Sequence, residues 1–308
     1  MHILYKNYLA LNKSIIPKTI CRLKSSRSSS QYCLDQLRNY DYENFVCTIL
    51  LKNIPRSVAL AVRSFNVEVS RVAEQVSQET IGLMRLKFWE EAIDKCYSGN
   101  IKYVPKHPVT TELYKAISKA NLTKRYLKNL VSARTQYINV HGFKTLTELE
   151  KYSDQTVASV FYLILEGCGV KNVDADHAAS HLGKSQGIIQ QLRSIPHARK
   201  LNFLPIPEDL LIKYQISQEE VLRSKESQKL SDCVYEIASR AHQHLVKSRS
   251  LIDKVPANGR AALLPAIPVS IYLDRLQELD YNILDHHLQI RTWKLLPSLY
   301  INNLRNRY

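Results

Sequence analysis

The sequence is poor in glycine, in paired cysteines and in long apolar runs. Only eight of its 308 residues are glycine, and no glycine-rich loop that could cradle a phosphate is present. The six cysteines are scattered without a Cys-x-x-Cys, which argues against a zinc ribbon or a disulfide framework and favours a reducing compartment. No strand-like alternation is bounded by turn residues, whereas apolar residues recur at helical spacing. The chain is therefore predicted to be all-α.

The longest apolar run, Val157–Leu165, is about half of the roughly 18 residues that a membrane span requires. It predicts a buried helix. Thr145, followed three residues later by Glu148, predicts the N-cap of that helix, which would continue through Leu165. A chain of 308 residues can bury about 75% of its unfolded surface, which is enough for one large domain.

The net charge of +15 is unevenly distributed. Residues 1–34 contain six lysines and arginines and no acid, so that the remainder of the chain carries +9. The first half of this segment places apolar side chains on one helical face, and residues 25–30 are rich in serine. This composition is typical of a mitochondrial transit peptide, and the alternative is a disordered basic tail. We assign residues 1–34 to the transit peptide and residues 35–308 to a single helical domain.

The segment His177–Leu210 suggests a long helix, a short basic linker, an extended segment and a new helix start. It contains, in order, Leu182-Gly183, Gln190-Gln191-Leu192-Arg193 and Asn202-Phe203-Leu204-Pro205. This order resembles the second signature of the squalene/phytoene synthase family. In that signature an aspartate follows the arginine, and further acids follow a turn later.

The carboxylates of this second signature are missing. Ser194 stands directly after Arg193 in the place of the aspartate, and His197 and Ala198 stand where the later acids are expected. The frame of the signature is therefore present without its acids.

A helix that begins near Pro55 resembles the region of the first aspartate-rich signature. Its apolar stripe has 4-3-4-3-4 spacing and consists of Val58, Val62, Phe65, Val69, Val72 and Val76. The residues that match the signature are Ser70, Arg71 and Glu74, so both leading aspartates are absent.

The resemblance implies what these losses mean. Enzymes of the family are understood to join two allylic diphosphates, and Mg²⁺ ions promote the departure of the diphosphate leaving group. Mg²⁺ takes oxygen ligands in near-ideal octahedra, so a single Glu74 cannot assemble several ions, and Arg71 would repel them. We expect no catalytic, cofactor-binding or metal-binding residue at either site. The segment around Ser70 is then either a solvated helix face with an Arg71–Glu74 pair or a remnant polar cleft.

The resemblance covers about residues 32–280 and implies an all-α, isoprenoid-synthase-like fold. In the matching segment Thr156–Phe161, Phe161 replaces a small glycine of the prenyl channel and would shorten or close that channel. Three further segments narrow the resemblance to a mitochondrial branch of the family, and they are Ser77–Arg85, Asn121–Arg125 and Asp176–His181.

Members of that branch are implicated in early biogenesis of respiratory complex I. The resemblance therefore implies a non-catalytic assembly factor without a cofactor. It implies a protein in the mitochondrial matrix, in peripheral contact with the inner membrane. Its partners would be complex I subunits or other assembly factors, and nucleic acid is not expected because no RNA-recognition signature accompanies the positive charge. The alternative is residual binding or transfer of a prenyl diphosphate or lipid, through Glu74, Arg71 and Arg193.

Three other groups have an ordinary interpretation beside a functional one. His177 and His181 could bind zinc at i, i+4 spacing, but Asp174 or Asp176 before them is better explained as a helix N-cap. The acids of residues 90–94 imitate a metal motif, yet we expect them to face water beside Lys87 and Lys95. A basic group near the second signature could hold an anion or form a surface patch, and it consists of Lys184, Arg193, Arg199 and Lys200.

Overall fold

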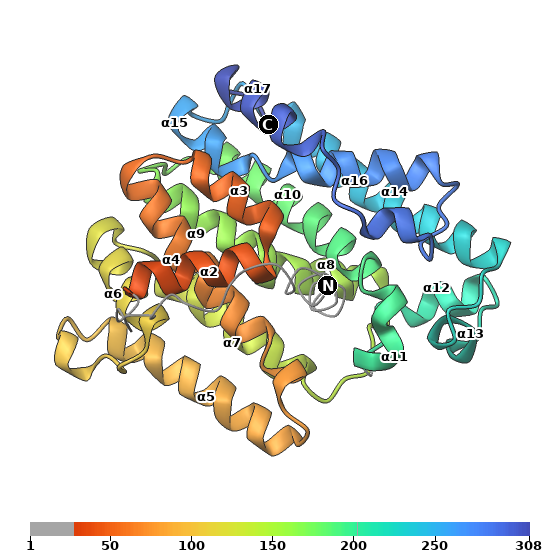
Figure 1. Ribbon diagram of the computed structural model, residues 1–308, viewed down its shortest axis with the longest axis horizontal. Helices are drawn as coiled ribbons and strands as arrows, with labels where there is room; N and C mark the ends of the chain where they lie inside the picture. The colour runs from red at the N-terminus through yellow and green to blue at the C-terminus, as the bar shows by residue number, and fades with distance from the viewer. Residues whose placement is uncertain (1–27, 202) are drawn as a thin grey trace, which may run out of the picture.

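The computed structural model describes residues 28–201 and 203–308, and it is built from helices (Figure 1). In the described residues the only β-type pairing is an isolated bridge between Gly142 and Leu204. The helices are α2 (Ser29–Tyr40), α3 (Tyr42–Leu50), α4 (Asn53–Ser70), α5 (Glu79–Cys96), α6 (Pro108–Ala120), α7 (Lys124–Tyr137), α8 (Leu146–Ser153), α9 (Ser159–Gly167), α10 (Val173–Leu192), α11 (Ala198–Leu201), α12 (Glu208–Lys213), α13 (Gln218–Leu222), α14 (Gln228–Ser250), α15 (Ala257–Arg260), α16 (Ala266–Glu278) and α17 (Leu295–Leu304). Short turns of other helix types are η1 (Ala73–Gln75), η2 (Ile101–Tyr103), the π-helical η3 (Asp154–Ala158), η4 (Ile195–His197), η5 (Ala261–Leu263) and η6 (His286–Gln289). The all-α prediction is confirmed.

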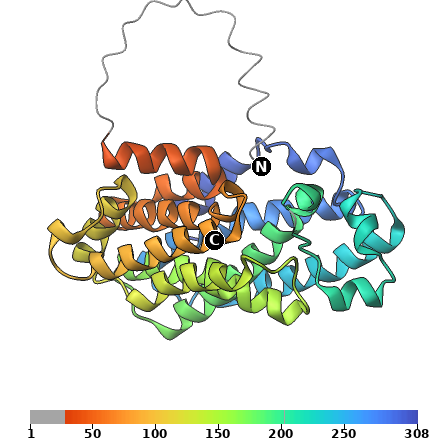
Figure 2. The same ribbon diagram turned by 90° about the horizontal axis from the view of Figure 1, so that it is seen from below.

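Helix α10 lies in the middle of the fold. It packs along α14 and also contacts α8, η3, α9 and α16. On the other side, α4 packs against α2, α6 and α9, so that α9 joins the two halves (Figures 1 and 2). One large cluster of buried apolar residues runs through both halves. A second, smaller cluster of buried apolar residues joins α17 to α3 and α16.

The apolar stripe places α4 in this core. Val58, Val62, Phe65 and Val69 are all buried, as the spacing predicts. The helix nevertheless ends at Ser70, and the chain passes through η1 before Val76, which is only partly buried. The stripe therefore identified the buried face correctly but extended the helix too far.

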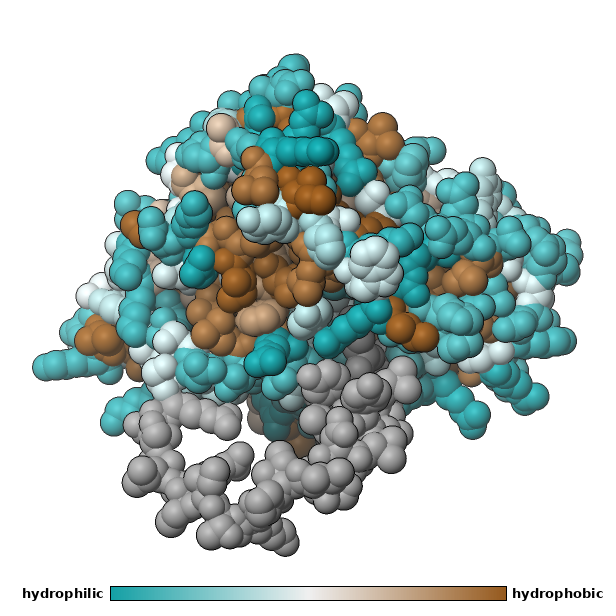
Figure 3. Space-filling model, turned by 45° about the horizontal axis from the view of Figure 1, so that its top comes forward, coloured by the Kyte–Doolittle hydropathy of each residue, from teal (hydrophilic) through white to brown (hydrophobic). Residues whose placement is uncertain are grey.

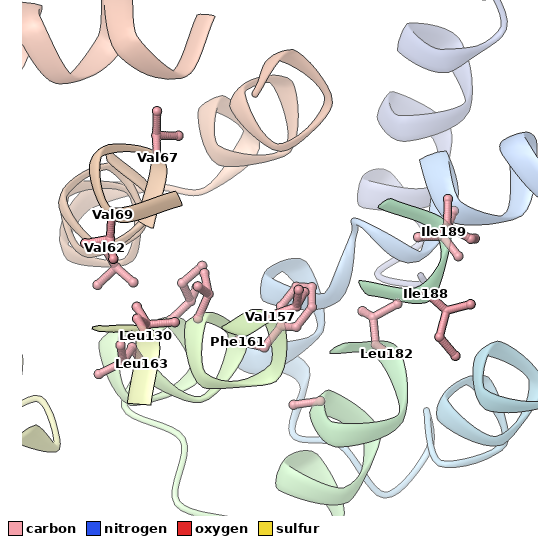
Figure 4. Packing of buried hydrophobic residues seen from close by; sticks show 14 of the residues in the cluster. Val62, Val67, Val69, Leu130, Val157, Phe161, Leu163, Leu182, Ile188 and Ile189 are labelled. Atoms are coloured by element: carbon pink, nitrogen blue, oxygen red, sulfur yellow. The ribbon is translucent and has the colours of Figure 1, made fainter. Parts of the chain in front are cut away.

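The predicted helix from Thr145 to Leu165 is present but is not uniform. The Thr145 side chain accepts a hydrogen bond from the Glu148 N–H at 3.2 Å, which confirms the N-cap. Between α8 and α9 the helix widens into the π-turn η3. Gly183 of α10 approaches this turn so closely that a Cβ on it would lie 2.5 Å from the Ala158 backbone. The Leu182-Gly183 pair of the sequence thus marks a close contact between two central helices, in the region shown in Figure 4.

The boundary predicted after residue 34 falls within a helix. Helix α2 begins at Ser29 with Ser28 as its N-cap, and Cys33 is fully buried in the core. The transit-peptide prediction for residues 1–27 lies outside the described residues. Among the described helices, none combines the length and the hydrophobicity that crossing a bilayer requires.

Candidate functional site

The residues matched to the first aspartate-rich signature lie at the end of α4 and just beyond it. Ser70 is the last residue of α4, and its hydroxyl donates to a backbone carbonyl of the preceding turn at 3.0 Å. Arg71 lies over the ring of Tyr40, with its Cζ 3.6 Å from the ring centroid. Glu74 is exposed in η1. Within the described part of the chain no ion pair joins Arg71 to Glu74, because the guanidinium stacks on Tyr40 instead.

Arg193 of the second signature points into the protein. Its Nη1 donates to Oε2 of Glu43 at 2.7 Å, and its Cζ lies 5.3 Å from the centroid of the Tyr272 ring. The carboxylate raises the pKa of Arg193 despite its burial. The arginine that precedes the missing aspartate therefore already has a carboxylate partner, which comes from α3.

The other three residues of the second signature lie in the turn after α10. The Ser194 hydroxyl donates to the Gln191 carbonyl at 2.7 Å. Ala198 is buried, and burial lowers the pKa of His197. The turn offers no carboxylate at the positions where the signature has acids.

Around Arg193 lies a group that we call the interior polar cluster. It consists of Asp41, Glu43, Asn44, Arg63, Gln186, Arg193 and Tyr272, from the α2–α3 junction and from α3, α4, α10 and α16. The amide of Asn44 donates to both carboxylate oxygens of Asp41, at 2.9 and 3.0 Å. Gln186 donates to the side-chain oxygen of Asn44 at 3.3 Å. The cluster therefore links the helix of the first signature to the helix of the second.

Charge in this cluster is balanced and is buried to different extents. Arg63 is 3% exposed, and its burial lowers its pKa, which Asp41 partly offsets. Burial raises the pKa of Asp41, and Arg63 opposes that shift. The Nε of Arg63 is buried and finds no hydrogen-bond partner in the described part of the chain, and its Cζ lies 5.8 Å from the centroid of the Phe161 ring. The two acids of the cluster thus face two arginines.

These residues do not fit magnesium. An Mg²⁺ site needs several oxygen ligands free to converge on one ion. Here Glu43 pairs with Arg193, and Asp41 is held by Asn44 beside Arg63. Across the part of the chain that the structure describes, the one group of three or more possible ligands is Asp285, His286 and His287 in and before η6, outside the cluster.

Phe161 is only 1% exposed and is packed in the core where the prenyl channel was expected (Figure 4). Hollows of about 500 Å³ and 430 Å³ lie elsewhere, beside α11 and α13. Arg199 lines both hollows and Lys200 lines the larger one, whereas Arg193 points toward Glu43. The basic group predicted from the sequence is therefore divided between the interior and the surface.

The histidine pair is also divided. His181 Nδ1 lies 2.9 Å from His244 Nδ1, and His244 Nε2 lies 3.2 Å from Oε1 of Glu150. His177 is exposed and belongs to no group of metal ligands among the described residues. His181 therefore contributes to a polar contact between α10 and α14.

The N-cap of α10 is Asn172, whose side chain accepts from the Ala175 N–H at 2.8 Å. The prediction of Asp174 or Asp176 as the cap was wrong. Both aspartates lie in the first turn of α10, where their negative charges interact favourably with the positive end of the helix dipole.

The acids of residues 90–94 lie on an exposed face of α5. Glu90 pairs with Lys87 at 2.9 Å, as predicted. Asp94 pairs with Lys124 and Lys128 of α7, each at 2.8 Å, and not with Lys95. These acids connect two surface helices.

Most of the interior polar cluster was missed by sequence reasoning. Arg63 was hidden because it adjoins an apolar stripe. A usable signal was present, since α4 carries an arginine among the run of apolar residues from Val58 to Val69. A charged residue flanked so closely by core positions indicates a buried partner of opposite charge.

Comparisons with known proteins agree with this architecture. A family model described as squalene/phytoene synthase matches residues 37–294. A Bos taurus protein named "NADH dehydrogenase (ubiquinone) complex I, assembly factor 6" is 40% identical, and the match covers 91% of this chain and 83% of that protein. The Drosophila melanogaster homolog of that name is also 40% identical, over 94% and 88% of the two chains. A phytoene synthase of Arthrospira platensis is 19% identical, over 95% and 98%.

Solved structures share the fold at low identity. A squalene synthase from Alicyclobacillus acidocaldarius matches with a TM-score of 0.72 and 16% identity, over 82% of this chain and 95% of that one. A dehydrosqualene synthase matches with a TM-score of 0.73 and 14% identity, over 90% and 96%. At such identities the similarity establishes the isoprenoid-synthase-like helical fold.

Proposed function

The chain belongs to the squalene/phytoene synthase family, and from this premise we propose that it is a non-catalytic assembly factor for mitochondrial respiratory complex I. The proposal is supported by relatives that carry complex I assembly in their names and match nearly the whole chain. It describes a helical scaffold that binds a complex I subunit or another assembly factor through its surface. The protein would act in the matrix, in peripheral contact with the inner membrane.

The interior polar cluster is the observation that carries the non-catalytic part of this proposal. Removal of a diphosphate requires positive charge that can be gathered around the leaving group, which Mg²⁺ supplies when carboxylates hold it. In this chain Glu43 is neutralised by Arg193, and Ser70 and Ser194 stand at signature positions. A pair of serines and an ion-paired glutamate cannot replace two sets of acids.

The assembly role is tested in cells depleted of the protein. We expect complex I to decrease on native gels and its activity to fall, while the other respiratory complexes keep their levels. Re-expression of the full chain should restore complex I. Normal complex I assembly and activity after complete depletion would refute the proposal. In cells that express the protein, crosslinking and pull-down from intact mitochondria would identify the subunit or assembly factor that it binds.

A second candidate is residual binding or transfer of a prenyl diphosphate or lipid in the interior. It is favoured by the buried Nε of Arg63 and the buried hydroxyl of Tyr272, neither of which has a hydrogen-bond partner among residues 28–201 and 203–308. Incubation of pure protein with farnesyl or geranylgeranyl diphosphate and Mg²⁺ tests it. We expect no product. Formation of a coupled product would establish an enzyme in place of a scaffold.

A further inference from the structure

Helix α17 carries apolar side chains on two of its sides. Leu295 and Leu299 face inward and are buried at 5% and 1% exposure, in a cluster with residues of α3 and α16. Leu296, Tyr300 and Leu304 recur every four residues on the outward side. An apolar helix face is normally covered by another part of the protein, by a partner or by a membrane. Only the inward side of α17 is covered in the described structure.

The outward side is strongly exposed. Trp293, two residues before the helix, is 78% exposed, and Leu304 at the other end is 67% exposed. Tyr300 is 60% and Leu296 is 53% exposed. Ile49 of the adjacent α3 is 40% exposed. We call these five residues the α17 surface. Figure 3 looks toward the part of the molecule that carries α17, and hydrophobic side chains gather in the middle of that view within a hydrophilic rim.

The segment that carries α17 is basic. Residues 291–308 contain four basic side chains, Arg291, Lys294, Arg305 and Arg307, and no aspartate or glutamate. Lys294 and Arg305 flank the two ends of α17 and are exposed. An apolar helix face with basic residues at its ends and a tryptophan at its border is the composition of a helix that lies in a membrane interface.

We propose that the α17 surface is where this protein lies on a bilayer that contains anionic lipids. The outward side chains enter the boundary between headgroups and acyl chains, with the helix axis parallel to the membrane plane. Trp293 anchors one end at headgroup depth, and Lys294 and Arg305 contact lipid phosphates. The inference rests on the proposed function in one respect, since it assigns the residues of the peripheral inner-membrane contact.

The two tryptophans of the chain allow a site-specific measurement. Trp89 is buried at 6% exposure, packed against Phe65 and His107, whereas Trp293 is exposed. The full chain is mixed with vesicles of phosphatidylcholine in which about one lipid in four is phosphatidylglycerol, with brominated acyl chains as quenchers. We expect emission from Trp293 to shift to shorter wavelength and to be quenched, and both effects to decrease as salt is raised. Vesicles that float the protein without quenching Trp293 would overturn the proposal, because another segment would then hold the membrane.

Variants separate the contributions. Trp293→Ala with Leu304→Ala should weaken vesicle binding about tenfold or more, since it removes apolar area that would be buried in lipid. Met84→Ala with Ile212→Ala is the matched control, because these side chains are 72% and 77% exposed on α5 and α12. The control should bind as the wild type does. Equal losses in the two double variants would overturn the proposal.

The contribution of the basic side chains to vesicle binding is tested with a second pair of double variants. Lys294→Gln with Arg305→Gln should weaken binding to the anionic vesicles about tenfold at low salt. Binding to vesicles of pure phosphatidylcholine should stay the same. Lys119→Gln with Lys225→Gln removes two exposed charges elsewhere and should change little. Unchanged binding in the first double variant would overturn the role of anionic lipid.

The test also distinguishes this inference from the proposed function. A crosslinker at Leu304 that captures a protein subunit in place of lipid would overturn the membrane assignment and leave the assembly role standing. Conversely, if lipid quenches Trp293 while depletion of the protein leaves complex I normal, that pair of results would refute the assembly role and leave the membrane contact standing.

Discussion

Arg193 at the end of α10 donates to Glu43 of α3 across a distance of 2.7 Å. This contact occupies the arginine of the second signature and one of the few acids nearby. It also joins α3 to the end of the central helix. A second contact beside it does the same, since Asn44, the residue after Glu43, accepts a hydrogen bond from Gln186 of α10. The arginine therefore holds two parts of the fold together.

Replacement of Arg193 by alanine should destabilise the fold. Glu43 would lose its partner in a partly buried position, and the packing on Tyr272 would be lost. Because the Glu43 side chain is 35% exposed, solvent screens part of the penalty, and we expect the free energy of unfolding to fall by about 2 kcal/mol. Urea denaturation measures this change. Arg223→Ala breaks an exposed pair with Glu219 and should cost no more than about 0.5 kcal/mol. Equal costs for the two variants would contradict a structural role for Arg193.

The sequence predicted the helical class and the buried faces well, because apolar spacing reports directly on burial. Val58, Val62, Phe65 and Val69 are buried for that reason. It predicted the end of α4 poorly, since the apolar spacing continues beyond the point where the backbone leaves the helix at Ser70.

The candidate site was harder to predict than the fold. The Arg193–Glu43 pair joins residues 150 positions apart, and the interior polar cluster draws on four helices and the α2–α3 junction. Such contacts depend on how helices pack, which no local spacing encodes. For the same reason His181 was compared with His177, its neighbour on one helix, and not with His244 across the α10–α14 contact.

Magnesium should not stabilise the protein. An ion that binds only the folded state adds about 2.7 kcal/mol to the free energy of unfolding at a hundredfold excess over its dissociation constant. With Glu43 and Asp41 already engaged, we expect the unfolding midpoint to stay unchanged when millimolar Mg²⁺ is added, alone or with inorganic diphosphate. Calorimetry with and without a chelator measures this. A rise in the midpoint that needs both additions would indicate a working diphosphate site.

Gly183→Ala should destabilise the contact between α10 and η3. Alanine favours a helix over glycine by about 1 kcal/mol, but its Cβ would lie 2.5 Å from the Ala158 backbone. Since backbone cannot rotate away as a side chain can, we expect a net loss of about 2 kcal/mol in urea denaturation. Gln190→Ala on the exposed side of the same helix is the control and should be neutral or slightly stabilising. A stabilised Gly183→Ala would show that the two helices can separate.

Stability should fall in acid because of the contact between α10 and α14. Burial, then the neighbouring His244 and lysines, lower the pKa of His181 to about 4. Burial opposes ionisation of Glu150, but hydrogen bonds from His244 and Arg240 lower its pKa to about 2. Both groups bind protons more tightly in the unfolded chain. His181 therefore contributes stability that is complete above its ordinary pKa of about 6.5 and is lost as the pH falls toward 4. The contribution of Glu150 is complete above about 4.5 and is lost as the pH falls toward 2.

The His181→Gln variant isolates the first of these two losses. Glutamine can still donate to His244 but does not titrate, so the variant should lose about 2 kcal/mol less stability than the wild type between pH 6.5 and 4, after allowance for partial exposure. His242→Gln, on the exposed side of α14, is the control for replacing a histidine by glutamine away from the His181–His244 contact. Urea denaturation at each pH gives the two curves. If wild type and His181→Gln lose stability in parallel from pH 6.5 to 4, protonation of His181 does not oppose folding, and the acid sensitivity must come from another group.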